Sequence, residues 1–254
     1  MKMEPKETEN LQNRFADLHN RSVSKGIYTY SGFMYEYDAA AAYKAAPAAD
    51  VRLYGGFPEA ERVVVRFGNE HDIPYEEPFP IGILEVSPVN DKFSDDFSHR
   101  DFLGALMHLG IERDVIGDIL IKRNTAWIFV LEKMSEFISR ELTRVKHTTV
   151  SVRITDDLPD DAGPRRETAL INVSSPRIDA VVAGFYRISR TRSRELFAAG
   201  RVFVNGTECR SGDRELKEND SVTVRGSGKF FYKGIQKETR KKREVVLVEF
   251  SCFR

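Results

Sequence analysis

Cysteine and tryptophan are scarce in this chain of 254 residues, which has two Cys and one Trp. Cys209 and Cys252 are far apart and form no Cys-x-x-Cys pair, which excludes a disulfide framework and a zinc-knuckle pattern. No apolar run approaches the roughly 18 residues of a membrane span, and residues 1–12 lack the apolar core of a secretory signal. We therefore expect a cytoplasmic protein in a reducing compartment that makes no contact with a membrane.

Patterns of catalysis and metal binding are also missing. The five histidines show no H-x-x-x-H or H-E-x-x-H spacing. The S-H-R-D run at residues 98–101 looks catalytic, but Ser98 and Asp101 have the spacing of a helix capping box, and no nucleophile and base lie near it at a defined spacing. Asp118 is better explained by a hairpin or strand-start role. The sequence predicts no catalytic residue, no metal site and no cofactor.

Charge is balanced overall but is unevenly distributed along the chain. Residues 176–254 contain 18 Lys and Arg against 10 Asp and Glu, whereas residues 1–175 contain 21 against 29. A local excess of positive charge acts on polyanions at short range whatever the overall isoelectric point. The basic C-terminal third therefore points to a nucleic acid as partner.

The first part of the chain, residues 1–80, is predicted to be mostly helical. Leu11, Phe15 and Leu18 have helical spacing, and the alanine-rich residues 38–49 suit a short, closely packed helix. A glycine turn at residues 54–62 then leads into a β-branched run that predicts a strand at 63–65.

Residues 81–170 are predicted to form a second domain. Apolar periodicity switches between strand and helix in the order βαββαβ, with helices at 101–109 and 132–144 and a hairpin turn at 123–125. This order is typical of the ferredoxin-like fold, a four-stranded sheet with two helices on one face. The acidic, turn-rich residues 156–167 read as a connector.

The third predicted domain, residues 175–254, begins with two short helices that pack on a small sheet. Ser175 is predicted to cap the first helix, with Pro176 at its first position, and Ser189 to cap the second, which ends at Gly200. On the second helix, Arg190 and Arg194 share one side and Arg192 lies on another.

The sheet of this domain is predicted from turns and short alternating runs. Asn205 and Gly206 have the signature of a type I′ hairpin turn, and strands are expected at 201–204 and 222–225. The K-F-F-Y-K run at residues 229–233 has two interpretations: a surface that clamps phosphates and stacks on bases, or a hairpin whose aromatics are core. The G-S-G run at 226–228 is predicted to be a bend between strands.

Two parts of the chain resemble known families. The run R-I-D at 177–179, I-S-R-T-R at 188–192, Leu196, G-R-V-F-V-N-G at 200–206 and N-D-S-V-T-V-R-G at 219–226 resemble the RNA-binding domain of ribosomal protein S-four type, or alpha-L motif. Upstream, Y-G-G-F-P-E-A-E-R at 54–62, S-H-R-D-F-L-G-A-L at 98–106, G-I at 110–111 and G-D-I at 117–119 resemble the YlmH family. This resemblance implies an RNA-binding C-terminal domain, a link to the large ribosomal subunit and the handling of stalled subunits that carry peptidyl-tRNA.

The expected fold class is therefore α+β: a helical segment, a ferredoxin-like domain and a small α/β alpha-L domain. The arginines of the C-terminal domain are the main candidate contacts, because a guanidinium group suits bidentate phosphate binding and base stacking. Asp179 is expected to orient Arg177 or an arginine of the second helix through an ion pair. Thr207 stands where the family often has lysine, which weakens a contact at the hairpin tip. The predicted RNA-binding residues are Arg177, Asp179, Arg187, Ser189, Arg190, Arg192, Arg194, Arg201, Asn205, Gly206, Arg225 and Lys229.

The function predicted from the sequence is that of a non-enzymatic, monomeric RNA-binding protein. It would grip structured ribosomal RNA, and also tRNA, on the large ribosomal subunit, in translation or the rescue of stalled ribosomes. The alternative is an RNA-modifying enzyme of the pseudouridine synthase or methyltransferase type, because S-four-type domains also occur fused to such enzymes. A third hypothesis is a protein-binding adaptor.

Overall fold

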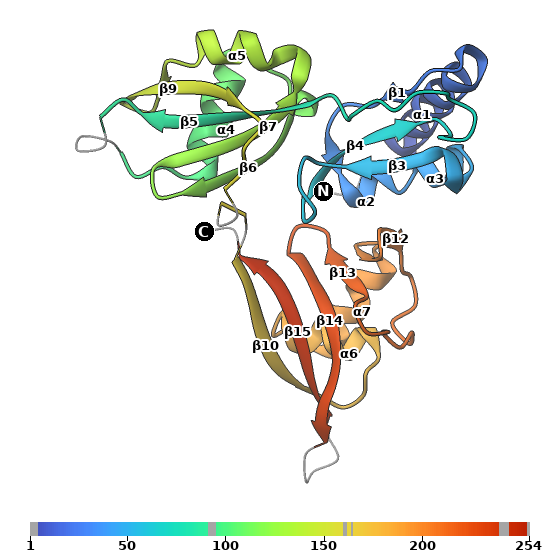
Figure 1. Ribbon diagram of the computed structural model, residues 1–254. Helices are drawn as coiled ribbons and strands as arrows, with labels where there is room; N and C mark the ends of the chain where they lie inside the picture. The colour runs from blue at the N-terminus through green and yellow to red at the C-terminus, as the bar shows by residue number, and fades with distance from the viewer. Residues whose placement is uncertain (1–4, 91–94, 160–161, 164, 239–243, 253–254) are drawn as a thin grey trace. The chain divides into compact units, whose positions relative to one another are not determined.

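The computed structural model describes residues 5–90, 95–159, 162–163, 165–238 and 244–252. These residues form two compact units, one that reaches residue 163 and one that spans Arg165–Cys252. Both units mix helices with antiparallel sheets (Figure 1), in agreement with the predicted α+β class. No helix in the described ranges is long and apolar enough to cross a membrane.

The N-terminal unit opens with a long helix and a small sheet. Helix α1 spans Pro5–Lys25, and the central strand β4 (Arg62–Phe67) pairs with β1 (Thr29–Tyr30), β2 (Met34–Tyr35) and β3 (Val51–Tyr54). Between β2 and β3 lie α2 (Glu36–Ala39), α3 (Ala42–Ala45) and η1 (Ala48–Asp50). The prediction of a mostly helical segment was therefore only partly right. Strands β1 and β2 have two residues each, which is too short for an alternating pattern to be visible.

The ferredoxin-like topology is present after this sheet. In chain order its elements are β5 (Ile81–Pro88), α4 (His99–His108), η3 (Arg113–Val115), β6 (Ile116–Lys122), β7 (Thr125–Leu131), η4 (Glu132–Met134), α5 (Ser135–Glu141), β8 (Arg144–Val145) and β9 (Thr148–Thr155). The antiparallel strand order is β6-β7-β5-β9-β8. Helices α4 and α5 contribute Phe102, Leu106 and Ile138 to a core with Leu84 and Ile128 on one sheet face.

On the opposite face of this sheet, the N-terminal segment covers strand β7. Phe33, Phe57 and Val64 pack against Trp127 and Phe129 of β7. Strand β4 is buried at all six positions because helix α1 covers one of its faces and this second core the other.

Hydrogen bonds from two side chains to backbone groups connect the small N-terminal sheet with the ferredoxin-like part of the N-terminal unit. The guanidinium of the buried Arg62 donates to the carbonyl oxygens of Phe33, Arg113 and Ile116, each at 2.9 Å. Asp118 accepts the backbone N–H of Glu61 at 2.6 Å, so its carboxylate has a structural use, although burial raises its pKa.

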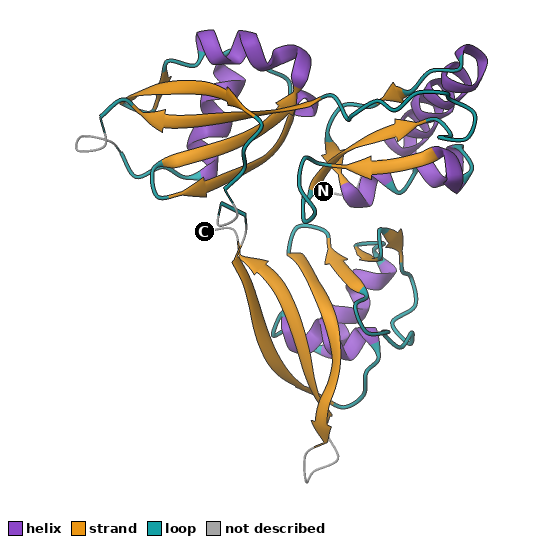
Figure 2. Cartoon of the chain, in the orientation of Figure 1, coloured by secondary structure: helices purple, strands orange, loops and turns teal. Residues whose placement is uncertain are grey.

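The C-terminal unit is a six-stranded antiparallel sheet with two helices on one face (Figure 2). Its elements are β10 (Arg165–Val173), α6 (Ile178–Phe185), α7 (Arg190–Ala198), β11 (Val202–Val204), β12 (Thr207–Glu208), β13 (Ser221–Val224), β14 (Gly228–Glu238) and β15 (Glu244–Cys252). The strand order is β10-β15-β14-β13-β11-β12. The bend at 226–228 joins β13 to β14 as expected.

Two details of this unit differ from the prediction. The whole of β10 pairs with β15, so the C-terminal unit begins at Arg165, whereas the sequence assigned residues up to 170 to the middle domain and began the last one at 175. Helix α6 begins at Ile178 with Arg177 as its N-cap residue, so the predicted cap by Ser175 is wrong. The carbonyl oxygens of Gly212 and Arg214 accept the N–H groups of the first turn in place of a capping side chain.

Candidate nucleic-acid interface

The candidate interface is built on helices α6 and α7 of the C-terminal unit. The apolar side of α6 carries Ile178, Val181 and Val182 into the core, and α7 adds Leu196 and Phe197. The Ser189 hydroxyl accepts the backbone N–H of Arg192 at 3.1 Å, which makes Ser189 the N-cap of α7, as predicted from sequence. The helix is thereby fixed at the end where its arginines begin.

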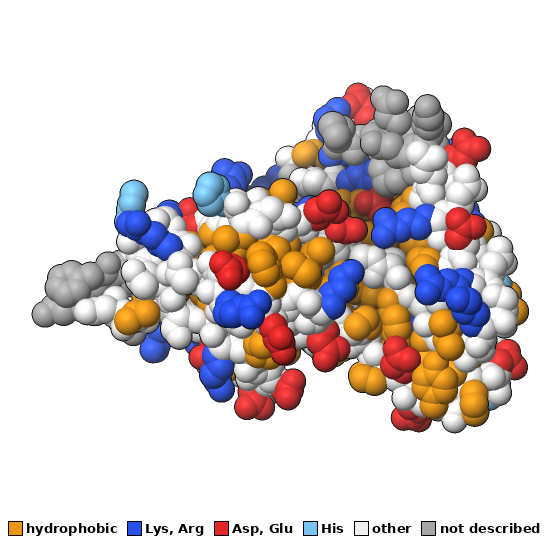
Figure 3. All heavy atoms as spheres, turned by 90° about the horizontal axis from the view of Figure 1, so that it is seen from above, with side chains coloured by type: hydrophobic (Ala, Val, Ile, Leu, Met, Phe, Trp, Pro, Cys, Tyr) orange, Lys and Arg blue, Asp and Glu red, His pale blue; other side chains and the backbone are white. Residues whose placement is uncertain are grey.

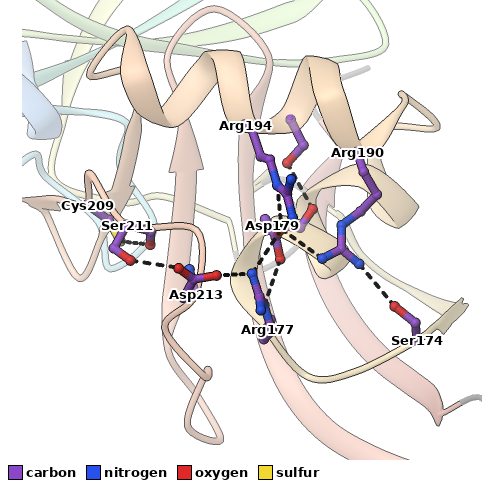
Figure 4. A network of polar contacts seen from close by, with 9 residues as sticks. Ser174, Arg177, Asp179, Arg190, Arg194, Cys209, Ser211 and Asp213 are labelled. Carbon is purple, nitrogen blue, oxygen red and sulfur yellow. Dashed lines mark hydrogen bonds and ion pairs between the residues drawn. The ribbon is translucent and has the colours of Figure 1, made fainter.

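Asp179 lies at the centre of this arrangement and is fully buried (Figure 4). Its carboxylate accepts Arg190 Nη2 at 2.8 Å and lies 3.4 Å from Arg177 Nε and 3.5 Å from Arg194 Nε. Burial by itself raises the pKa of Asp179, but the hydrogen bonds and charges of Arg190 and Arg177 outweigh burial and hold the pKa below its usual value. A single carboxylate thus orients three arginines, the N-cap residue of α6 and two from α7.

Further contacts of these arginines and of the Asp179 backbone complete the network. Arg190 Nη1 donates to Ser174 Oγ at 3.0 Å, Arg177 pairs with Asp213, and Ser193 Oγ donates to the carbonyl oxygen of Asp179 at 2.8 Å. Sequence reasoning missed Ser174, Ser193 and Asp213. Their contacts join residues 14 to 36 positions apart, so no local sequence pattern pointed to them.

The arginines of α7 differ in their exposure and in their partners. The Arg194 side chain is 66% exposed and the Arg190 side chain 38%, so both guanidinium groups can contact a ligand while anchored on Asp179. Arg192 lies outside this network and pairs with Glu195 at 2.7 Å, as expected from its place on another side of the helix.

Arg187 occupies an unusual backbone conformation between the two helices. Its φ angle is +54°, in the left-handed region that favours glycine. The N–H of Ile188 donates to the carbonyl oxygen of Ala183 at 3.0 Å, which is the bond that closes a Schellman motif. An exposed arginine at a position that glycine would fill at lower energetic cost points to a use for its side chain.

The remaining predicted site residues belong to the strand region and lie outside the Asp179 network. Arg201 Nη2 donates to the Arg225 carbonyl oxygen at 2.7 Å. Asn205 and Gly206 both have positive φ, +50° and +75°, as a type I′ turn requires, and the Asn205 amide donates to Asp220 at 2.8 Å. These contacts give Arg201 and Asn205 structural uses. The ammonium of Lys229 lies 5.5 Å from the ring centroid of Phe231.

The face drawn in Figure 3 has acidic and basic side chains interspersed. Surface charge on that face therefore marks no site by itself. The aromatic side chains on the far face of β7 are not available for base stacking, because Phe129 is 0% and Trp127 only 7% exposed beneath the N-terminal segment.

The side chains that looked catalytic in the sequence have structural contacts. The backbone N–H and the hydroxyl of Ser98 donate to Asp101 at 2.8 and 2.6 Å, and Asp101 also pairs with Lys146 at 3.0 Å. This is the capping box at the start of α4. Within the described ranges no group of three or more His, Cys, Asp or Glu side chains is placed to hold a metal ion.

Comparison with known proteins adds three findings. Residues 74–157 match a family described as "Putative RNA-binding domain in YlmH". The "Ribosome-associated protein quality control protein P2" of Bacillus subtilis strain 168 is 32% identical over 208 residues, which are 79% of this chain and 79% of that protein. The solved "Cell division protein ylmH from Streptococcus pneumoniae" is 16% identical with a TM-score of 0.49, over 61% of this chain and 94% of that one. The likeness to the Bacillus protein thus extends well beyond residues 74–157.

Proposed function

The chain belongs to the YlmH family, and on that premise we propose that it is a non-enzymatic RNA-binding protein that acts on the ribosome. The C-terminal unit is proposed to be an S-four-type domain that grips structured ribosomal RNA of the large subunit, and also tRNA. The curated relative is named for ribosome-associated quality control, and we extend that role to this chain as the handling of stalled ribosomes.

The observation that carries the proposal is the set of arginines held by Asp179. Three arginines around one buried carboxylate leave a positive excess, and those of α7 present guanidinium groups to the surface. A planar guanidinium that is already oriented loses less conformational entropy when it binds a phosphate. Arg187, Arg192, Arg201, Arg225 and Lys229 are proposed as further contacts, and Ser189, Asn205 and Gly206 as residues that fix the backbone between them.

The proposal of a non-enzymatic role is supported by the uses found for candidate catalytic groups. Ser98 and Asp101 cap a helix, and Asp118 accepts backbone N–H groups in the core of the N-terminal unit. Mass spectrometry of ribosomal and transfer RNA from cells with and without the protein tests this part. A modification that disappears with the protein would favour the RNA-modifying enzyme.

The RNA-binding proposal is tested by co-sedimentation of the full chain with separated ribosomal subunits across a salt series. The test variant is Arg192→Glu with Arg194→Glu, both exposed on α7. The matched control is Arg140→Glu with Arg153→Glu, which makes the same change of charge at two exposed arginines of the N-terminal unit.

We expect the wild type to bind the large subunit with a slope of log affinity against log salt near −3, which corresponds to about four phosphate contacts at roughly 0.7 each. The α7 variant should bind weakly, with a slope near −1.4 if about two contacts are lost. The control should bind like the wild type. Binding to neither subunit, or equal losses in both double variants, would contradict the proposal.

A further inference from the structure

The sheet of the C-terminal unit has a second face, which α6 and α7 do not cover (Figure 2). Along β13, β14 and β15, every second residue points into the core beneath the helices, as Val222, Phe230, Tyr232 and Val248 do. Side chains alternate between the two faces of a strand, so the intervening residues point to the opposite face. On these three strands the outward residues include Ser221, Thr223, Lys229, Phe231, Lys233, Leu247 and Glu249.

Phe231 is an aromatic side chain of this face and is partly exposed. The ammonium groups of Lys229 and Lys233 lie 5.5 and 5.8 Å from the centroid of its ring. Its cross-strand neighbour on β13 is Ser221, which has a small side chain. The arrangement separates the two interpretations of the K-F-F-Y-K run: Phe230 and Tyr232 are core, whereas Phe231 and the two lysines lie on the other face.

The charged groups next to Phe231 are two lysines and one carboxylate. Arg225, which follows β13, lies further along the sheet, over Phe203 and 5.5 Å from its ring centroid. Glu249, opposite Phe231 on β15, is the nearby carboxylate and lies 3.6 Å from Lys233. Phe203 is only 5% exposed, which leaves Phe231 as the ring with an accessible surface.

We propose that this face is a second RNA-binding surface, on which an unpaired base stacks on Phe231 while Lys229 and Lys233 contact the flanking phosphates. A ring bordered by cations on an open sheet suits single-stranded RNA, because every base has a π-face and every linkage a negative charge. The inference rests on the proposed function but uses the face opposite α7. The protein would thus hold folded RNA with its helices and an unpaired segment with its sheet.

The test uses the full chain and a short single-stranded RNA that contains one 2-aminopurine, whose fluorescence falls when it stacks. Phe231→Ala should weaken binding at least about fivefold and abolish the quenching, since base stacking on an aromatic is a substantial part of such binding. Phe231→Trp should retain both. Lys229→Gln with Lys233→Gln should reduce the salt dependence of binding. The fluorescence quenching measured at saturation should stay the same as in the wild type.

Leu170→Ala is the matched control, because Leu170 is a large apolar side chain, 61% exposed, on the same face of the edge strand β10. It should bind the RNA like the wild type. Thermal unfolding of each variant shows whether the fold is kept. Wild-type affinity and quenching in a folded Phe231→Ala variant would overturn the inference.

The outcomes separate this inference from the proposed function. Loss of large-subunit binding in the α7 double variant, with normal oligonucleotide binding in Phe231→Ala, would refute only the sheet surface. Normal large-subunit binding in the α7 double variant would refute the proposed function. Loss of binding to a protein ligand, but not to RNA, in Phe231→Ala would assign the face to protein contact and overturn the inference.

Discussion

Replacement of Asp179 by Asn tests whether RNA binding depends on the orientation of the arginines or only on their positive charge. Asparagine has the same shape but no charge, so the short bond from Arg190 Nη2, 2.8 Å long, loses its ionic component. The contacts of Arg177 and Arg194 are longer, 3.4 and 3.5 Å, and Arg194 is mostly exposed, so they contribute less. Allowing for the smaller cost of burying an amide, we expect a loss of about 2 kcal/mol in the stability of α6 and α7.

The effect of this variant on RNA binding has a sign that distinguishes two explanations. The variant carries one more net positive charge, so general electrostatic attraction would strengthen binding to RNA. If Asp179 orients the arginines, binding must weaken, because two arginines would have to be ordered on binding at about 0.5–1.5 kcal/mol each. We expect binding about thirtyfold weaker, because the middle of that range is about 2 kcal/mol for two arginines.

Native-state hydrogen exchange of the full chain measures the stability change. The single tryptophan, Trp127, lies in the other unit, so its fluorescence does not follow α6 and α7. Asp213→Asn is the control, since Asp213 pairs with Arg177 but is itself 74% exposed, and it should change exchange by less than about 0.5 kcal/mol. Tighter RNA binding by Asp179→Asn, or unchanged exchange in α6 and α7, would refute the reasoning.

Three further predictions concern backbone and titration. Arg187→Gly should raise the stability of the C-terminal unit by up to about 1 kcal/mol in exchange experiments, because glycine adopts a φ of +54° at lower cost. The variant should nevertheless bind RNA more weakly, because it lacks the guanidinium; unchanged binding would remove Arg187 from the interface. Gly56→Ala should destabilise the N-terminal unit by about 2–4 kcal/mol in urea unfolding followed by Trp127 fluorescence, since φ is +100° and the new Cβ would lie 2.2 Å from Phe129; a loss below about 0.5 kcal/mol would contradict this packing. The lowered pKa of Asp179 means that its contribution to stability is complete above the ordinary value of 3.8 and is lost as the pH falls through the folded-state pKa; exchange of α6 and α7 down an acid series should lose this dependence in Asp179→Asn.

Sequence patterns predicted the elements whose signal is local. The ferredoxin-like strands and helices were found because Ile81–Pro88, Thr125–Leu131 and the intervening helices have clear periods of two or of 3.6 residues. The caps at Ser98 and Ser189 were found for the same reason, since each contacts a group three residues ahead. The Asn205-Gly206 turn is likewise set by two adjacent residues.

Features set by distant contacts could not be predicted in this way. The N-cap of α6 depends on carbonyl oxygens at residues 212 and 214, which replace the expected hydroxyl of Ser175. Strand β10 was assigned in part to a connector because its partner, β15, lies about 80 residues further along. At the candidate site, an ion pair of Asp179 with Arg177 or with a second-helix arginine was predicted, and the structure has both; Asp213 was not predicted, because nothing local relates it to Arg177.

The cover over β7 has a practical consequence for any attempt to isolate the RNA-binding segment recognised by sequence. A fragment cut at residues 74 and 157 would lose Phe33, Phe57 and Val64, and with them the layer over Trp127 and Phe129. It would also lose Arg62, the donor to the carbonyl oxygens of Arg113 and Ile116. Such a fragment would expose Leu120, Trp127 and Phe129 as an apolar patch that favours aggregation, so a stable piece needs the residues that cover them. The segment recognised by sequence is shorter than the segment that folds.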